Sequence, residues 1–451
     1  MKIIKFNGLV FDYSRTSLSK KHMAALTKLA REKKLTQRRD DMFAGKKINL
    51  TSGTAALHTA LRAKRSEKIC VDGANVVPGV YAVLDRMKAF SNTVRSGKYR
   101  GYSGKPITDI VHIGIGGSAL GTRLVTRALE AHHHPRLRAH FVSGALPVTL
   151  KSLSPETTLF VFVSKTFRTE ETLLMARIAQ EWFVKKGAPL KHMAKHMVGV
   201  TENVAAAVAF GIREEQVFRI WNWVGGRYSA WSAVGITAMI MAGPEVFERF
   251  LSGGRRIDEH FKTAPLEKNI PAMLALTGMA HRNFFDYPAY ASIPYPTELE
   301  FFPLWLQQLD MESNGKSVTL QGKKVSVSTG PIVFGVLGED AQHSFFQWLH
   351  QGTDIIPIEF ISLASDTNCL FQANILHKGQ KNIAEPQNNL AGGRPSTMLV
   401  AKSITPEVLG MLMAIYEHKV FVQGILWNIN SFDQCGVEIG KLLKKKALKV
   451  K

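Results

Sequence analysis

The strongest constraint on the fold is a repeated pattern in which a short apolar run ends at a turn of small residues and a helical segment follows. The run 107–115 ends in Gly-Ile-Gly-Gly-Ser and precedes helical spacing over 118–131. The run 157–163 ends in Ser-Lys-Thr and precedes helical spacing over 170–186. Strands that alternate with helices in this way are typical of a parallel sheet covered by helices. We therefore predict an α/β fold.

The same pattern predicts further elements in both halves of the chain. In the first half we expect an extended segment over 137–142, a third strand junction over 195–200 and a helix over 229–241. In the second half we expect strands over 325–327, 332–334 and 355–361, helices over 342–350 and 406–429, a loop at the end of 370–389, and a last helix from about Gly436.

Gly253 and Gly254, followed by Pro265 and Pro271, indicate a change of domain between the two halves. We expect four parts. They are a basic helical segment (1–50), a first α/β domain (51–245), a second α/β domain (246–430) and a C-terminal helix with a basic tail (431–451).

Composition argues against several classes of protein. The three cysteines, Cys70, Cys369 and Cys435, are too few and too far apart for a disulfide framework or a zinc site, which favours a reducing cytoplasm. The run 132–134 of histidines has no Cys or carboxylate at ligand spacing, so we expect no metal. The N-terminus meets Asp12 before a signal-peptide core could form, and the longest uncharged stretch is too short for a membrane span. We predict a cytoplasmic protein that does not contact membranes.

The chain is strongly basic, with 58 Lys and Arg against 36 Asp and Glu and a formal net charge of +22. Much of the excess lies in the segments 15–39 and 441–451. Such a field attracts anionic substrates, but it also attracts nucleic acid and acidic lipid without specificity. Because no known nucleic-acid motif accompanies the charge, we interpret it as a solvated basic surface with no specific nucleic-acid partner.

Two turns are suited to binding an anion. Glycines between a strand and a helix, as in 114–118, leave backbone amides free to approach a phosphate at the helix N-terminus. Ser164, Thr166 and Thr169 bring three hydroxyls to the second such turn, although these residue types are also ordinary helix caps. Neither turn fits a nucleotide motif: the first is not G-x-G-x-x-G and lacks the ribose-binding acid after the next strand. The 315–317 triplet Gly-Lys-Ser is not a P-loop, because Asp310 stands where its first glycine belongs.

Six motifs, in order along the chain, resemble the glucose-6-phosphate isomerase (phosphoglucose isomerase) family. They are 113–121, 164–172, 224–232, Gln308 with 311–316, 342–352 and 430–441. The resemblance implies two sugar-isomerase (SIS) domains, each a parallel sheet flanked by helices, plus a C-terminal helical arm. It also implies that no metal or organic cofactor is used.

The reaction implied by the resemblance is the reversible isomerisation of D-glucose 6-phosphate and D-fructose 6-phosphate through a cis-enediol intermediate, in glycolysis and gluconeogenesis. Glu312 matches the base that moves a proton between C2 and C1. Arg227 matches the cation that stabilises the enediolate. His350 and Lys441 match the pair that opens the sugar ring, and the resemblance implies that His350 is donated by the neighbouring subunit of a homodimer.

The remaining matches are substrate contacts: Gly117, Ser118, Ser164, Lys165, Thr166, Thr169, Gly226, Gln308 and Gln434. Three alternatives stay open from the sequence. One is a non-catalytic sugar-phosphate-binding module on the same fold, a second is a basic nucleic-acid-binding protein, and the third is an isomerase that also accepts mannose 6-phosphate.

Overall fold

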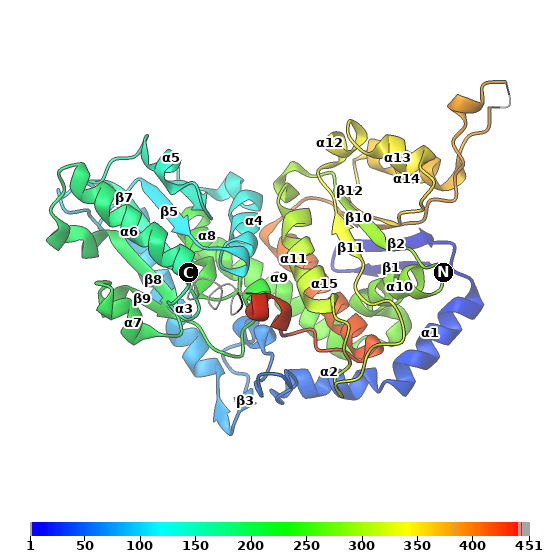
Figure 1. Cartoon of the computed structure of the whole chain (residues 1–451), viewed down its shortest axis with the longest axis horizontal. Coiled ribbons are helices and arrows are strands. Elements are labelled where there is room, and N and C mark those ends of the chain that lie inside the picture. Colours follow the sequence, from blue (N-terminus) through cyan, green and yellow to red (C-terminus); the bar gives the residue numbers. More distant parts are fainter. Residues whose placement is uncertain (1, 383, 441–442, 444–451) are drawn as a thin grey trace.

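The computed structural model describes residues 2–382, 384–440 and 443, and it has two lobes, each built around one twisted sheet (Figure 1). The first lobe holds the five-stranded sheet, in the order β6-β5-β7-β8-β9, and all its strands are parallel. The strands are β5 (Asp109–Ile113), β6 (Arg138–Val142), β7 (Thr158–Val163), β8 (Met197–Thr201) and β9 (Val217–Arg219).

Helices cover both faces of the first sheet, which is why β5, β7 and β8 are buried at every position and are almost continuously apolar. The helices of this lobe include α3 (Val77–Arg95), α4 (Leu120–Ala128), α5 (Leu146–Leu150), α6 (Glu170–Lys185), α7 (Val204–Ala209) and α8 (Ile236–Ala242). The expected strands and the helices that follow β5 and β7 are confirmed. The expected helix over 229–241 is shorter, because one-turn 3-10 helices at Gly226–Tyr228 and Ala233–Gly235 precede α8.

The second lobe holds the six-stranded sheet, in the order β1-β2-β13-β12-β10-β11. Its strands are β1 (Ile3–Phe6), β2 (Leu9–Arg15), β10 (Ala289–Pro294), β11 (Ile332–Phe334), β12 (Ile358–Leu363) and β13 (Ser396–Ala401). Strands β10 to β13 are parallel to one another, in registers such as Ile358 opposite Ser396, whereas β1 and β2 are antiparallel. The sheet therefore combines a parallel core with an antiparallel edge.

The N-terminal segment differs from the helix expected over residues 1–50. Residues 3–15 form a hairpin that pairs through β2 with β13, and only then come helices α1 (Lys20–Glu32) and α2 (Leu35–Phe43). The hairpin turn is Asn7-Gly8, both with positive φ, which is the preferred turn for two antiparallel strands. Leu9, Phe11 and Tyr13 are buried at every second position, the period of a strand.

Other elements of the second lobe also differ from expectation. Residues 325–327 lie in a loop and not in a strand, while β10 and β13 were not foreseen. The helix expected over 342–350 is divided into α12 (Gly338–Gln342) and α13 (Phe346–Gln351). Helix α14 (Thr367–Lys378) occupies the start of the segment 370–389, which ends in a loop as expected. The last helix, expected from about Gly436, is described from residue 435 to residue 440.

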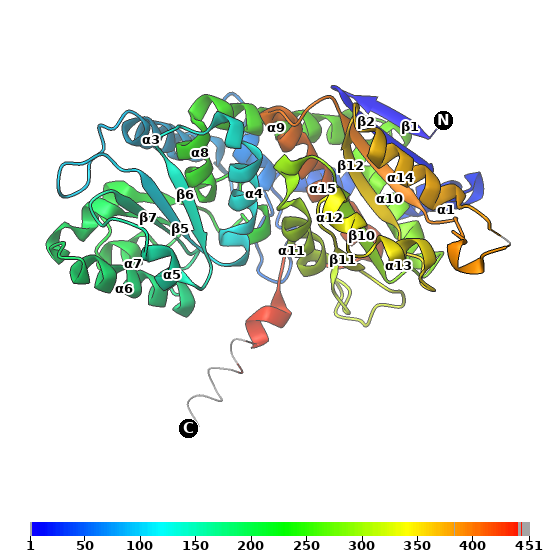
Figure 2. The same ribbon diagram turned by 90° about the horizontal axis from the view of Figure 1, so that it is seen from above.

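Two long helices join the lobes, α9 (Pro244–Thr263) and α15 (Pro406–Trp427), the second confirming the helix expected over 406–429. Gly253 and Gly254, expected to mark a change of domain, lie inside α9. They allow a close helix crossing, since a Cβ added at Gly253 would lie 2.0 Å from the carbonyl oxygen of Glu407. Helix α11 (Phe302–Asn314) lies between the lobes, and the described part of the C-terminal helix leaves the body beside it (Figure 2). Among the described residues, no helix is long and apolar enough to cross a membrane.

Candidate active site

The first part of the site is the glycine turn after β5. Strand β5 lies between β6 and β7, so the turns that follow β5 and β7 leave the sheet at the point where the strand order reverses, the usual ligand position in such sheets. Gly116 has φ +56°, and a Cβ added at Gly117 would lie 2.2 Å from the carbonyl carbon of Gly226. The turn after β5 therefore touches the turn of Gly226 and Arg227 through its backbone, and only glycine fits at 117.

The second part is the turn after β7. The Ser164 hydroxyl donates to the Thr169 hydroxyl at 3.1 Å, and Phe167 between them has φ +52°, a conformation that folds the turn back on itself. Thr169 is the N-cap residue of α6, yet within the described chain its side chain makes no capping hydrogen bond. Two hydroxyls thus lie at the positive end of a helix dipole, an arrangement suited to an anion.

Lys165 holds this turn against a neighbouring segment. Its ammonium donates to the carbonyl oxygens of Asn222 at 3.0 Å and Val224 at 3.1 Å, and burial lowers its pKa. Residues 222–224 lead directly into the turn of Gly226 and Arg227. A cleft of about 560 Å³ lies beside the turn, lined by Thr166, Arg168, Glu202, Asn203, Arg219, Ile220, Trp221 and Asn222.

The third part is a carboxylate beside a buried arginine. Glu312 lies in the last turn of α11, and Gln308, one turn earlier, donates from Nε2 to Glu312 Oε2 at 2.8 Å. Arg227 Nη1 lies 3.7 Å from the same Oε2 atom. The Arg227 side chain is 1% exposed and that of Glu312 is 21% exposed, so the carboxylate can meet a ligand while the guanidinium stays behind it.

Several acceptors fix the Arg227 guanidinium. Its Nε donates to the Ser313 hydroxyl at 2.5 Å, and its Nη2 donates to the carbonyl oxygens of Ser431 at 2.7 Å and Asp433 at 3.1 Å. Its Nη1 donates to Gln434 Oε1 at 3.4 Å. Because these acceptors come from α11 and from the C-terminal segment, Arg227 joins the two lobes at one point.

The sequence-predicted residues therefore fall into three groups. Gly117, Gly226, Arg227, Gln308, Glu312 and Gln434 are connected by close contacts, and Ser118, Ser164, Lys165, Thr166 and Thr169 lie in the adjoining turns. His350 lies elsewhere, on α13, half-buried in a separate cleft of about 630 Å³ in which no residue of the first group takes part. Burial lowers the pKa of His350. Lys441 lies outside the described residues.

A comparison with models of protein families identifies the family of this chain. The model of the phosphoglucose isomerase family matches residues 12–450. The chain belongs to the phosphoglucose isomerase family.

Relatives of known name agree with this assignment. Over 99% of its length the chain is 46% identical to a glucose-6-phosphate isomerase from Chlorobium luteolum, of which it covers 87%. Over 98% of its length it is 45% identical to a glucose-6-phosphate isomerase from Cupriavidus metallidurans, of which it also covers 87%. The crystal structure of a glucose-6-phosphate isomerase from Chlamydia trachomatis superposes with a TM-score of 0.91 at 33% identity, over 100% of this chain and 90% of that one. The predicted fold class, α/β with parallel sheets flanked by helices, is confirmed.

Sequence reasoning on this phosphoglucose isomerase family member missed the residues that support Arg227. Ser313 accepts from Arg227 and also lies 2.9 Å from the Tyr228 hydroxyl, and Lys316 and Asp433 form an ion pair nearby. The sequence signal that could have identified Ser313 and Lys316 as site residues is their position in the motif 311–316, which contains Glu312. In the described part of the chain, no group of three or more His, Cys, Asp or Glu side chains could hold a metal ion.

Proposed function

We propose that this protein interconverts D-glucose 6-phosphate and D-fructose 6-phosphate. The observation that carries the proposal is the pairing of Glu312 with Arg227 at 3.7 Å, next to two turns suited to a phosphate. The names of the relatives support the same activity. A non-catalytic sugar-phosphate-binding module is not supported, because the relatives that match nearly the whole chain are named as isomerases.

In the proposed mechanism the turn of Ser164 to Thr169, with Gly117 and Ser118, holds the phosphate and the adjoining sugar. Glu312 removes a proton from C2 of the aldose and returns it to C1, so one carboxylate serves both transfers. The hydrogen bond from Gln308 orients that carboxylate. In the reverse direction Glu312 removes a proton from C1 of the ketose and returns it to C2. The hydroxyl proton moves from O2 to O1 when the ketose forms and from O1 to O2 when the aldose forms, so each direction balances.

Negative charge grows on the C1 and C2 oxygens as the proton leaves, and Arg227 stabilises it. A guanidinium suits this role because it stays charged and its planar fork is already oriented by Ser313 and the Ser431 carbonyl. Charge placed in advance near a developing anion accelerates the reaction more than it strengthens substrate binding. Gln434 and Gly226 complete the pocket around the sugar hydroxyls.

Ring opening needs an acid and a base, and we assign these roles to His350 and Lys441. Half-burial lowers the pKa of His350, which favours the neutral imidazole that can accept a proton. Within one chain His350 lies on α13, apart from the group of Glu312 and Arg227. We therefore assign the His350 of each site to the neighbouring subunit of a homodimer.

We place the enzyme in glycolysis and gluconeogenesis in the cytoplasm. Cys70, Cys369 and Cys435 are free thiols, as expected in a reducing compartment.

The test is to incubate the purified protein with fructose 6-phosphate and to measure glucose 6-phosphate with a coupled dehydrogenase. We expect turnover, and for Glu312→Gln a loss of about 10³-fold or more in kcat. The matched control is Glu300→Gln, an exposed glutamate paired with Arg127, which should leave kcat unchanged. Wild-type protein without turnover, or Glu312→Gln with unchanged turnover, would contradict the proposal. Mannose 6-phosphate as a second substrate decides whether the enzyme has dual specificity.

A further inference from the structure

Lys316 binds the C-terminal end of the helix that carries Glu312. Its ammonium donates to the carbonyl oxygens of Glu312 at 2.9 Å and Ser313 at 2.8 Å. The last carbonyls of a helix have no N–H partner within it, and a cation there also opposes the negative end of the helix dipole. The described last turn of α11 contains no basic residue, so Lys316, two residues beyond the helix, supplies that cation. It thereby fixes the backbone that directly follows the Glu312 Cα atom.

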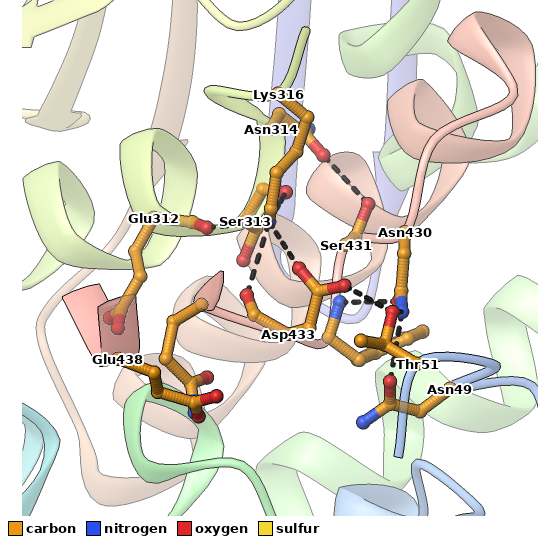
Figure 3. Close-up of polar contacts among 12 residues, drawn as sticks. Asn49, Thr51, Glu312, Ser313, Asn314, Lys316, Asn430, Ser431, Asp433 and Glu438 are labelled. Carbon is orange, nitrogen blue, oxygen red and sulfur yellow. Dashed lines mark hydrogen bonds and ion pairs between the residues drawn. The ribbon is translucent and has the colours of Figure 1, made fainter. Parts of the chain in front are cut away.

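Asp433, in the segment that follows α15, binds Lys316 (Figure 3). Its Oδ1 atom lies 3.2 Å from Lys316 Nζ, and its backbone carbonyl accepts a hydrogen bond from the same ammonium at 3.1 Å. Its Oδ2 atom accepts a hydrogen bond of 2.5 Å from the Thr51 hydroxyl. The ion-paired side chains are only 17% and 14% exposed. One carboxylate therefore connects three segments that are distant in sequence.

The backbone that Asp433 fixes is the backbone that orients Arg227. The Arg227 guanidinium donates to the carbonyl oxygens of Ser431 and Asp433. Its Nη1 also donates to the side chain of Gln434, the residue after Asp433. Ser431 is tied in turn to α11, because its hydroxyl donates to Asn314 Oδ1 at 2.7 Å. A shift of the segment 431–434 would therefore move the guanidinium and the Gln434 amide relative to Glu312.

The charges in this cluster depend on one another. Burial lowers the pKa of Lys316 and the positive charge of Arg227 lowers it further, whereas the Asp433 carboxylate raises it. Without that carboxylate, Lys316 and Arg227 would share a largely buried space, and of the described carboxylates that act on Lys316 only Glu312 would remain. Asp433 thus has an electrostatic role as well as a steric one.

We propose that Lys316 and Asp433 are positioning residues, whose ion pair, braced by Thr51, holds Arg227 and Gln434 in register with Glu312. Neither side chain is assigned a contact with the substrate. The inference rests on the proposed isomerase function. A displacement of about 1 Å at a reacting group can cost about 10²-fold in rate, so a pair that fixes this geometry should control kcat.

The experiment compares Asp433→Asn, which keeps the size of the side chain and removes its charge, with Asp72→Asn. Asp72 forms an exposed ion pair with Lys47 and serves as the matched control. We expect kcat of Asp433→Asn to fall by about 10- to 100-fold, with KM changed by less than about threefold. Asp72→Asn should retain the wild-type kcat. An unchanged kcat in folded Asp433→Asn would overturn the inference, whereas absence of turnover in the wild-type protein would instead overturn the proposed function.

Two further variants separate positioning from general stability. Lys316→Arg keeps the cation, so it should retain at least about tenfold more kcat than Lys316→Met, and equal values would count against the inference. Thr51→Val removes the hydrogen bond that this exposed loop residue donates to Asp433 and the one that it accepts from Asn430, and it serves if Asp433→Asn does not fold. We expect it to lower kcat by a few-fold without lowering the thermal midpoint. A loss of kcat that follows the thermal midpoint across the whole series would indicate a purely structural role and would also overturn the inference.

Discussion

Arg227 Nη1 lies 3.7 Å from Glu312 Oε2, although Arg227 follows the sheet of one lobe and Glu312 lies in the last turn of a helix beside the other. The guanidinium is held by acceptors from α11 and the C-terminal segment, so its direction is set before a substrate arrives. Preorganised charge of this kind needs no rearrangement when an anion develops beside it. The packing of the two lobes therefore sets the position of Arg227 beside Glu312 that the proposed chemistry requires.

Arg227→Lys should lower kcat by about 10²- to 10³-fold while KM changes much less. Lysine keeps the positive charge, but its single ammonium cannot bind Ser313, Ser431 and Gln434 at the same time. Steady-state kinetics with fructose 6-phosphate provide the measurement. Arg138→Lys, at an exposed position of β6, is the control and should keep wild-type kinetics. A variant as active as wild type would show that charge alone is sufficient.

Gly117→Ala should abolish most activity, because the added Cβ would lie 2.2 Å from the backbone of Gly226 and would force the two turns apart. The turn that carries Arg227 would move with Gly226. The control is Gly144→Ala, where an added Cβ meets no atom within 4 Å. We expect kcat/KM to fall by at least about 10²-fold for Gly117→Ala only. Similar kinetics for the two variants would refute the close-approach argument.

Mixed dimers test whether His350 acts across a subunit interface. Glu312→Gln and His350→Ala should each be inactive alone. If His350 is donated by the partner, each mixed dimer has one site with both groups intact, so co-refolding equal amounts should restore about a quarter of wild-type activity. If His350 acts within its own chain, every site lacks one group and the mixture stays inactive. Mixing without unfolding controls for the exchange of subunits.

His112 should make stability depend on pH. Burial in β5 lowers the pKa of His112 to about 4, although its Nε2 atom lies 2.7 Å from the Ser118 carbonyl oxygen. The unfolded chain takes up the proton near pH 6.5 and the folded chain does not, so this contribution to stability is present above pH 6.5 and is lost as the pH falls toward 4. At pH 5 the loss is about 2 kcal/mol.

His112→Asn removes the titrating group and keeps a donor and an acceptor. The variant should therefore lose less apparent thermal stability than wild type between pH 7 and pH 5. Burial lowers the pKa of His260 and His281 to about 4 as well. The contribution of His112 is therefore the difference between wild type and variant in how steeply the thermal midpoint changes with pH. Parallel slopes for the two proteins would contradict the assignment.

Arg62→Met should destabilise the fold strongly. Arg62 is fully buried between Asp258 and Glu417, with contacts of 2.6 Å to each, and removing it leaves two buried carboxylates without their guanidinium partner. Loss of one side of a buried ion pair costs about 3–5 kcal/mol. Arg65→Met is the matched control, because Arg65 pairs with Asp85 on the exposed surface, where such pairs contribute little. Denaturant midpoints of both variants provide the measurement, and equal midpoints would exclude a structural role for the buried pair.

The sequence alone determined the parts of this protein that depend on near neighbours. The strands β5 and β7, the helices after them and the long helix α15 have patterns complete within a single segment, and so do the motifs around Gly117, Ser164 and Glu312. The N-terminal hairpin also has a local signal, namely the Asn7-Gly8 turn and the alternation of buried residues after it. We nevertheless expected a helix there, because many basic residues follow. Strands β10 and β13 were missed because short apolar runs fit a buried strand and a helix equally well.

The tertiary structure alone decided which distant residues meet. Nothing local to Thr51, Lys316 or Asp433 indicates that their side chains share one cluster, because that contact follows from how the two lobes pack around α11. The same packing brings Arg227 to Glu312 and leaves His350 in a separate cleft of its own chain. A residue type and its spacing can specify a chemical role, whereas distance and burial result from the packing of the whole chain.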